Sequence, residues 1–148
     1  MRLWHKDLIP VLPRQQLLAQ WRECCCITRN IAVNGTPNHL LVNKIMDYPI
    51  EKDFYTYCTL IIMEMRRRGY NISQQAYHNW CKNMATAVNH RPFSLDNSDH
   101  DVFKGWHNTR YLTQCYFNLQ EKYDCGGISE QEWNRVAQAY NLRFTKKV

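Results

Sequence analysis

Apolar residues recur every three or four positions in several stretches of the chain, as in helices that bury one face. In the longest stretch, the apolar face is formed by Leu17, Trp21, Cys24, Cys25, Thr28, Ile31 and Ala32. Its polar face carries Gln16, Gln20, Glu23 and Asn30. The whole pattern predicts helices over about residues 13–33, 51–68, 74–88 and 106–123, and a short fifth helix after Ser129.

Capping residues support these boundaries. Pro13 suits the first turn of the first helix, and Asn34-Gly35 suits its end. Ser73 is a typical N-cap for the third helix, and Ser129 and Glu132 have the spacing of a capping box.

The segments between the helices are predicted to be irregular. Residues 1–12 are expected to be irregular or extended, residues 36–49 to connect with room for a helical turn, and residues 89–105 to form a loop. The basic tail at 143–147 is expected to be loose. No strand of convincing length and no repeat is visible, so the pattern predicts an all-α, compact, single-domain helical bundle over residues 1–148.

Two groups of side chains are expected to lie in the core. In the third helix, the inward positions are Tyr77, Trp80, Cys81 and Met84. The tryptophans expected to be core residues are Trp4, Trp21, Trp80 and Trp106.

The charge of the chain suggests an acidic partner. The formal net charge is +6 and the pI is about 9.0, which favours nucleic acid first and a membrane surface second. Solubility alone could also account for it. No signal peptide and no run of transmembrane length is visible, so we expect a cytoplasmic protein that does not enter membranes.

The seven cysteines show neither a disulfide framework nor a metal site. Their number is odd, and no Cys-x-x-Cys pair occurs. Three consecutive cysteines on a helix point about 100° apart and cannot all face one metal ion. Buried thiols that behave as small apolar groups are the better interpretation. Common catalytic motifs and helical histidine pairs are also missing, so the sequence offers no anchor for metal catalysis.

An N-terminal amine with a nearby carboxylate offers a different chemistry. An α-amino group has an ordinary pKa of about 7.7–8.0, against about 10.4 for lysine, so more of it is the free amine at neutral pH. A free amine can attack an electrophilic carbon such as C1′ of a deoxyribose, and a carboxylate can shuttle the protons. Glu23 is a candidate for that carboxylate because it is not a core position of its helix.

Two blocks of sequence resemble the pyrimidine-dimer DNA glycosylase family. The first comprises Met1-Arg2-Leu3-Trp4 and residues 15–23, and the match needs no gap between the chain start and Glu23. The second comprises residues 39–42, Tyr48 and residues 64–72, and a weaker echo is found at residues 119–122.

The resemblance implies a compact all-α domain, with the N-terminal segment threaded between helices, that needs no cofactor. In the family, the N-terminal amine attacks C1′ of a damaged nucleotide through a Schiff base, and β-elimination then nicks the strand. By position, Glu23 corresponds to the catalytic glutamate, and Gln15, Arg22 and Lys122 correspond to DNA contacts. The implied partner is double-stranded DNA with damaged or abasic sites, bound by a monomer.

The chain departs from the family pattern at several positions. Arg2 stands where the phage member has a small residue exposed by removal of the initiator Met, so the nucleophile could be the amine of Met1 or of Arg2. Leu3 replaces a basic neighbour, Cys26 replaces an arginine, and a basic tail replaces an aromatic one. Lyase chemistry is therefore better supported than dimer specificity.

A second basic group lies at the end of the second helix. Arg66 and Arg67, in the run that ends before Gly69, could contact phosphates or merely complement the helix dipole. Arg22 and Lys122 have a similar plain alternative, as solvated helix residues.

Two non-enzymatic alternatives remain at this point. Residues 51–88 superficially resemble a helix-turn-helix, which would make the chain a DNA-binding module. The outward residues of the second helix of that pair would be Gln74, Gln75, His78, Asn79 and Lys82. A protein-interaction domain whose charge only maintains solubility is the third interpretation.

Overall fold

All five predicted helices are present in the computed structural model, which describes residues 1–90 and 101–145, with side chains to residue 142. They are α1 (Arg14–Asn34), α2 (Tyr55–Arg67), α3 (Gln74–Ala87), α4 (Thr109–Asp124) and α5 (Glu130–Thr145). The short turns are η1 (Lys6–Val11), η2 (Asn43–Asp47), a π-helical turn η3 (Ile50–Phe54) and η4 (Val88–His90). The predicted all-α class is confirmed. Among the described helices, none combines the length and the apolar character needed to cross a membrane.

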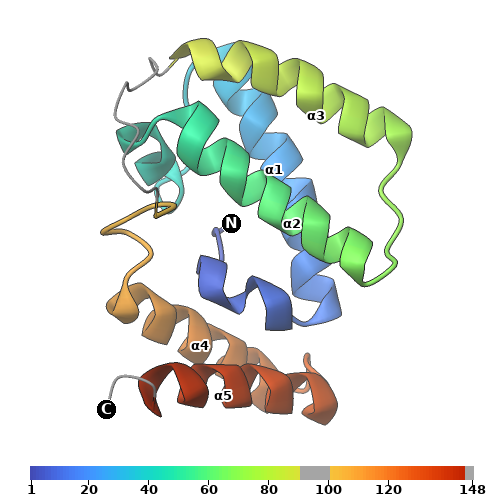
Figure 1. Cartoon of the computed structure of the whole chain (residues 1–148), viewed down its shortest axis with the longest axis vertical. Helices are drawn as coiled ribbons and strands as arrows, with labels where there is room; N and C mark the ends of the chain where they lie inside the picture. The colour runs from blue at the N-terminus through green and yellow to red at the C-terminus, as the bar shows by residue number, and fades with distance from the viewer. Residues whose placement is uncertain (91–100, 146–148) are drawn as a thin grey trace.

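The N-terminal segment lies between two groups of helices (Figure 1). On one side are α2 and α1, with α3 packed mainly against α1; on the other side α4 pairs with α5. Leu3, Leu8 and Leu12 of this segment are fully buried in the common core. The chain start is thus held inside the molecule by helices from both halves of the sequence, as the resemblance implied.

Local capping explains where the helices begin and end. Gly35 has φ +77°, a left-handed conformation that favours glycine and stops α1 as predicted. Ser73 accepts a hydrogen bond from the amide of Ala76 at the start of α3. Ser129 Oγ accepts from the amide of Glu132 over 3.2 Å, which confirms the capping box of α5.

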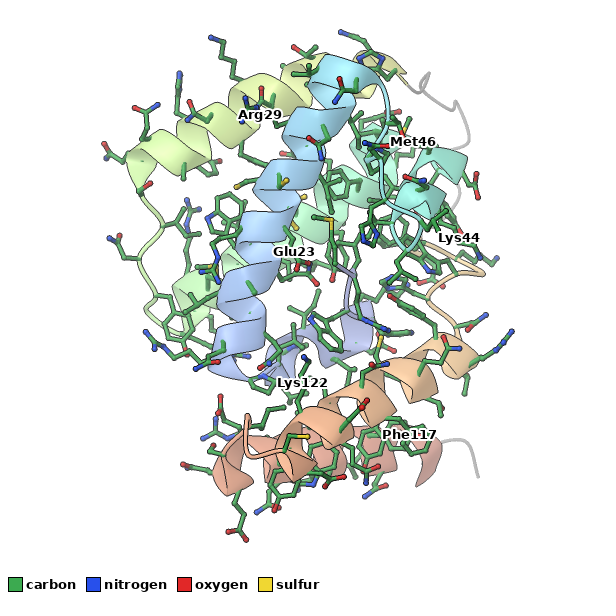
Figure 2. All side chains as sticks on the ribbon, turned by 180° about the vertical axis from the view of Figure 1, so that it is seen from behind. Glu23, Arg29, Lys44, Met46, Phe117 and Lys122 are labelled. Carbon is green, nitrogen blue, oxygen red and sulfur yellow. The ribbon has the colours of Figure 1, made fainter. Side chains whose placement is uncertain are left out.

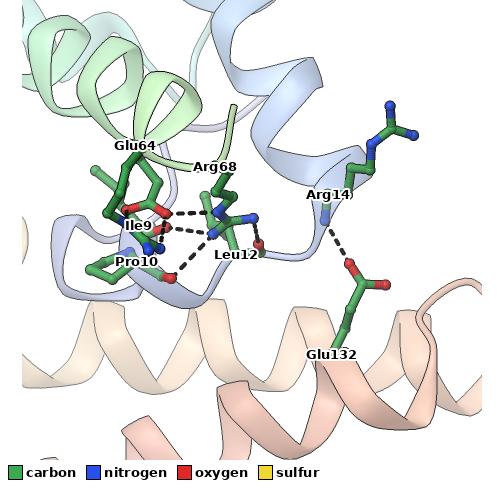
Figure 3. Close-up of polar contacts among 8 residues, drawn as sticks. Ile9, Pro10, Leu12, Arg14, Glu64, Arg68 and Glu132 are labelled. Atoms are coloured by element: carbon green, nitrogen blue, oxygen red, sulfur yellow. Dashed lines mark hydrogen bonds and ion pairs between the residues drawn. The ribbon is translucent and has the colours of Figure 1, made fainter. Parts of the chain in front are cut away.

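Glu132 also serves a second helix. One of its carboxylate oxygens, Oε2, accepts a 2.7 Å hydrogen bond from the backbone amide of Arg14, the first residue of α1 (Figure 3). Since Pro13 offers no side-chain cap there, a carboxylate from α5 satisfies one of the unpaired amides of α1.

Three boundary predictions were wrong in part. Residues 6–11 form a 3₁₀ helix rather than an irregular segment, because the ring of His5 accepts a hydrogen bond from the amide of Asp7. The fourth helix begins at Thr109 rather than at 106, since Asn108 caps it. Helix α5 continues to Thr145, so residues 143–145 are not a loose tail.

The prediction of a loop over residues 89–105 was correct only in part. Its central part, residues 91–100, lies outside the described residues. The described end, residues 101–105, contributes Val102 and Phe103 to the core. Phe103 has a positive φ of 55°, and its amide donates a 2.7 Å hydrogen bond to the buried carboxylate of Asp53.

Burial predictions succeeded for the tryptophans and were wrong at some other positions. All four named tryptophans are buried. Tyr77 and Cys81 are exposed, because α3 contacts the core through a narrower stripe that includes Trp80 and Met84. The cysteines divide: the buried ones are Cys24, Cys58 and Cys115, the exposed ones are Cys26, Cys81 and Cys125, and Cys25 is intermediate. Gln20, assigned to the polar face of its helix, is 1% exposed.

Candidate active site

A cavity of about 360 Å³ lies between α1 and α4. Its lining residues are Trp4, Gln15, Gln16, Leu18, Ala19, Arg22, Glu23 and Lys122. Four of the predicted site residues therefore meet in one place, and the last of them is about a hundred positions away from the others in sequence. Figure 2 shows Glu23 on α1 and Lys122 on α4 on the same face of the molecule.

Gln20 connects the carboxylate of Glu23 to the N-terminal segment. Its side-chain amide donates to Glu23 Oε2 over 3.2 Å and to the carbonyl of Arg2 over 3.0 Å. Its carbonyl oxygen accepts from the amide of Trp4 over 2.9 Å. A buried glutamine bonded on both sides of residue 3 fixes the path of the chain start beside Glu23.

Tyr57 of α2 reinforces the same junction. Its hydroxyl lies 2.6 Å from the carbonyl oxygen of Trp4 and 3.1 Å from Gln20 Oε1. Burial raises the pKa of the Tyr57 hydroxyl well above its ordinary value, so it stays a neutral donor. Two buried side chains from α1 and α2 thus grip the backbone of residues 2–4.

The side chain of Arg2 leaves the junction in another direction. Its guanidinium lies over the ring of Trp4, with Cζ 5.5 Å from the ring centroid. It also interacts with Tyr111 and Cys115 of α4. The backbone of residue 2 therefore faces Gln20 and Glu23, whereas its charge is placed against α4. Met1 is exposed.

The cavity combines one carboxylate with two cations. Glu23 accepts a hydrogen bond from Gln20 alone among the described residues. Arg22 and Lys122 are exposed and make no side-chain hydrogen bond or ion pair within the described part of the chain. Such a site can hold a phosphate near a group that transfers protons.

The model of one protein family, described as pyrimidine dimer DNA glycosylase, matches residues 1–78. The match includes the N-terminal segment, α1 and α2, and it covers more than half of the chain. The chain belongs to this pyrimidine dimer DNA glycosylase family. Comparisons with curated proteins and with solved structures gave no match.

Membership of this glycosylase family makes the chain a DNA repair glycosylase and DNA its substrate. It favours the enzymatic interpretation over the two non-enzymatic ones. The five polar residues named on α3 are exposed as predicted, yet α3 packs mainly against α1 rather than forming a unit with α2. Lys122 lies beyond the matched residues, so its place in the cavity is evidence from the structure alone.

The glycosylase has a second group of charges, at the end of α2, that does not line the cavity. Glu64 is 7% exposed and accepts hydrogen bonds from both Arg67 and Arg68. Burial alone would raise the pKa of its carboxyl, but these bonds lower it below the ordinary value. The i,i+3 and i,i+4 spacing of these residues is the sequence signal for this pairing.

Arg68 is the structural member of that arginine run. It donates to the carbonyls of Leu12, Ile9 and Pro10, and so fastens η1 to α2 (Figure 3). The two arginines predicted to contact DNA remain exposed: Arg66 lies over the ring of Tyr77, and Arg67 is paired with Glu64. Their contact with phosphate stays a prediction.

A pair of buried imidazoles supports the N-terminal segment from the α4 side. The rings of His5 and His107 stack with centroids 5.0 Å apart, and His107 Nδ1 accepts from the amide of Lys6 over 3.1 Å. Burial, with the neighbouring His5 and Lys6, lowers the pKa of His107 to about 2. His107 therefore acts as a neutral acceptor.

Proposed function

We propose that this DNA repair glycosylase uses the α-amine of its N-terminal segment as nucleophile and is also an AP lyase. The observation that carries the proposal is the Gln20 side-chain amide, which bonds both the Arg2 carbonyl and the Glu23 carboxylate beside the cavity. The amine is that of Met1 or, if Met1 is removed, that of Arg2. The damaged or abasic nucleotide enters the cavity between α1 and α4.

The proposed reaction begins with bond exchange at C1′. The amine lone pair forms a bond to C1′, and the glycosidic bond breaks with its electron pair on the departing base. Glu23 accepts the proton that the amine loses and returns it to O4′ as the C1′–O4′ bond opens, which leaves an iminium linkage. At an abasic site the same linkage forms with loss of water from C1′ instead of a base.

Strand cleavage follows from the same intermediate. Glu23, ionised again, takes a proton from C2′, and the 3′ phosphate leaves with the C3′–O electron pair. Water then hydrolyses the imine and frees the amine. In this scheme Glu23 is the catalytic residue, and Arg22 and Lys122 hold the phosphates that flank the nucleotide. Gln15 lines the same cavity, and in this scheme it contacts the DNA backbone.

Gln20 is a positioning residue in this scheme. It touches no substrate, because it is buried, but it fixes the chain start and the carboxylate relative to each other. Such pre-organisation matters because an attacking atom displaced by about 1 Å can cost about a hundredfold in rate.

Borohydride trapping tests the proposal. The wild-type protein is incubated with a duplex that carries one abasic site, in the presence of borohydride, which reduces an imine to a stable amine. We expect a covalent adduct, and peptide mapping should place the DNA on the N-terminal peptide and show whether Met1 or Arg2 carries it. The undamaged duplex is the control and should give no adduct.

Two results would count against this mechanism. Absence of an adduct under conditions where the protein binds the abasic duplex would rule out the Schiff base. An adduct on a lysine, such as Lys122, would keep the lyase chemistry but overturn the assignment of the α-amine.

A further inference from the structure

A second hollow region adjoins the cavity on the other side of the Arg2–Trp4 stack. Two hollows of about 330 and 410 Å³ share Leu41, Tyr111 and Gln114 in their linings, and Arg2 lines the larger one. Because Arg2 lies over Trp4, and Trp4 lines the active-site cavity, one stacked pair separates the two regions.

Large apolar side chains are displayed to solvent around these hollows. Leu40 is 90% exposed, and Leu41 and Phe117 are each 55% exposed. Leu41 lines both hollows, Leu40 lines the smaller one and Phe117 the larger one. Three such residues grouped at one place form a patch of the kind that marks an interaction site.

The turn that carries the two leucines is anchored from behind. Val42 and Ile45 are fully buried, so the next positions of the chain fix the turn to the core. The amide of His39 donates to Asn43 Oδ1 over 3.0 Å, and the amide of Leu41 donates to His39 Nδ1 over 3.2 Å. The leucines are therefore presented outward by a braced turn.

The surroundings of this patch are positively charged. Besides Arg2, the linings include Lys44 and Arg110, and neither contains a carboxylate. On α4 the residues Arg110, Gln114, Asn118 and Lys122 follow one another at intervals of four, so they form one stripe that runs into the active-site cavity. Figure 2 shows Lys44 and Phe117 on the same face as Glu23 and Lys122.

We propose that the Leu40–Leu41 turn, together with Phe117, is an apolar wedge that enters duplex DNA beside the damaged nucleotide. The inference rests on the proposed function. Extruding a nucleotide leaves unstacked bases, and apolar side chains that fill the gap lower that cost while the flanking cations bind phosphates. Charge complementarity and continuity with the active-site cavity assign the patch to DNA rather than to a protein partner.

A binding experiment that needs no chemistry tests the wedge. The probe is a duplex with a tetrahydrofuran abasic analogue next to 2-aminopurine, whose fluorescence rises when the base is unstacked. The wild-type protein should raise the fluorescence. The Leu40→Ser/Leu41→Ser variant should lose most of that rise and bind the probe about tenfold less tightly. Phe117→Ala should act in the same direction.

Matched controls separate the wedge from folding and from catalysis. Met63, an apolar residue of α2 that is 64% exposed and lines neither hollow, provides the control Met63→Ser, which should change nothing. Cleavage of a single-stranded abasic oligonucleotide, in which there is no duplex to unstack, should be the same in wild type and double variant. If the wild type did not cleave this oligonucleotide, the lyase proposal would be refuted. The fluorescence test would still decide whether the wedge enters the duplex.

Two outcomes would overturn the wedge. One is a double variant that binds and unstacks the probe as the wild type does. The other is a wild type that sediments as a dimer and a variant that sediments as a monomer with DNA binding unchanged, since the patch would then join two copies of the chain.

Discussion

Glu23 and Glu64 are both helical carboxylates near arginines, yet their surroundings differ. Glu64 is buried and bonded to two guanidiniums, one of which also holds the backbone of η1. Glu23 borders a cavity and receives one hydrogen bond, from a neutral amide, among the described residues. Among the described residues, Glu23 forms no ion pair with the nearby Arg22 or Lys122.

The difference shows what each carboxylate is suited to do. A carboxylate saturated by guanidinium donors stays ionised and holds elements together, so its contribution is structural. A carboxylate with free lone pairs beside a cavity can gain and lose protons, and unpaired cations nearby can bind an anionic ligand. If the number of charged neighbours in the sequence were the criterion, Glu64 rather than Glu23 would have been the first candidate for a catalytic carboxylate.

Changing the cavity carboxylate should have the largest effect. We expect Glu23→Gln to lower kcat on abasic duplex DNA by at least about a hundredfold, since proton transfer by a placed side chain typically contributes that much or more. DNA affinity and the thermal midpoint should stay near the wild-type values. Cleavage kinetics and gel-shift titration measure this, with Glu130→Gln, at an exposed position of α5, as control. Full activity in Glu23→Gln would refute the role of Glu23.

Changing the saturated carboxylate should give the opposite result. Glu64→Gln leaves the partly buried Arg68 guanidinium without its anion, so it should lower the free energy of unfolding by about 1–3 kcal/mol. Chemical denaturation measures the loss, and kcat well below the melting temperature should be preserved. Arg68→Gln should lose more stability than Arg67→Gln, because Arg68 also bonds three carbonyls of the N-terminal segment. Equal losses would show that the contacts to η1 contribute nothing.

The junction between the two regions can be tested at Gln20. Gln20→Met keeps the shape of the side chain but removes its bonds to Arg2, Trp4 and Glu23, so kcat should fall about tenfold while KM changes little. Tyr57→Phe is the matched control, since it removes a buried bond to the same segment without touching Glu23. We expect both variants to lose stability and only Gln20→Met to lose kcat; a parallel loss in both would mean that Gln20 acts through folding alone.

The smallest effect concerns acid. Because the pKa of His107 is about 2 in the folded protein and about 6.5 when unfolded, the unfolded state alone binds this proton between those values. Its contribution is complete above pH 6.5 and declines as the pH falls, by about 1.4 kcal/mol per pH unit at most. His107→Gln should be less stable at neutral pH but show a flatter decline between pH 6.5 and 5. Identical slopes in urea unfolding series would contradict this assignment.

The fold was predictable from the sequence where one helix face meets one core. Helix α1 ends and helix α3 begins close to the predicted residues because Gly35 and Ser73 are unambiguous caps. Gln20 was misassigned because its partners, residues 2 and 4, come from an extended segment that periodicity does not place. The burial of Phe103 likewise depends on a distant carboxylate, Asp53.

The candidate site was predictable only by resemblance. Nothing in helical periodicity places Lys122 and Glu23 around one cavity, because that arrangement depends on how the α4–α5 pair docks. The arginine run shows the converse, since its charge pattern suggested phosphate binding where Arg68 in fact bonds carbonyls of η1. Neither the Gln20 junction nor the Leu40–Leu41 patch has a local sequence signal.

The hydrogen bond from Arg14 to Glu132 has a consequence for how the chain can vary. The first turn of the helix that carries Glu23 is completed by an oxygen from α5, which lies outside the part of the chain that matches the family. A residue beyond the matched part thus stabilises a helix inside it. A change at the Glu132 carboxylate, or removal of α5, would therefore loosen the first turn of the helix that carries Glu23.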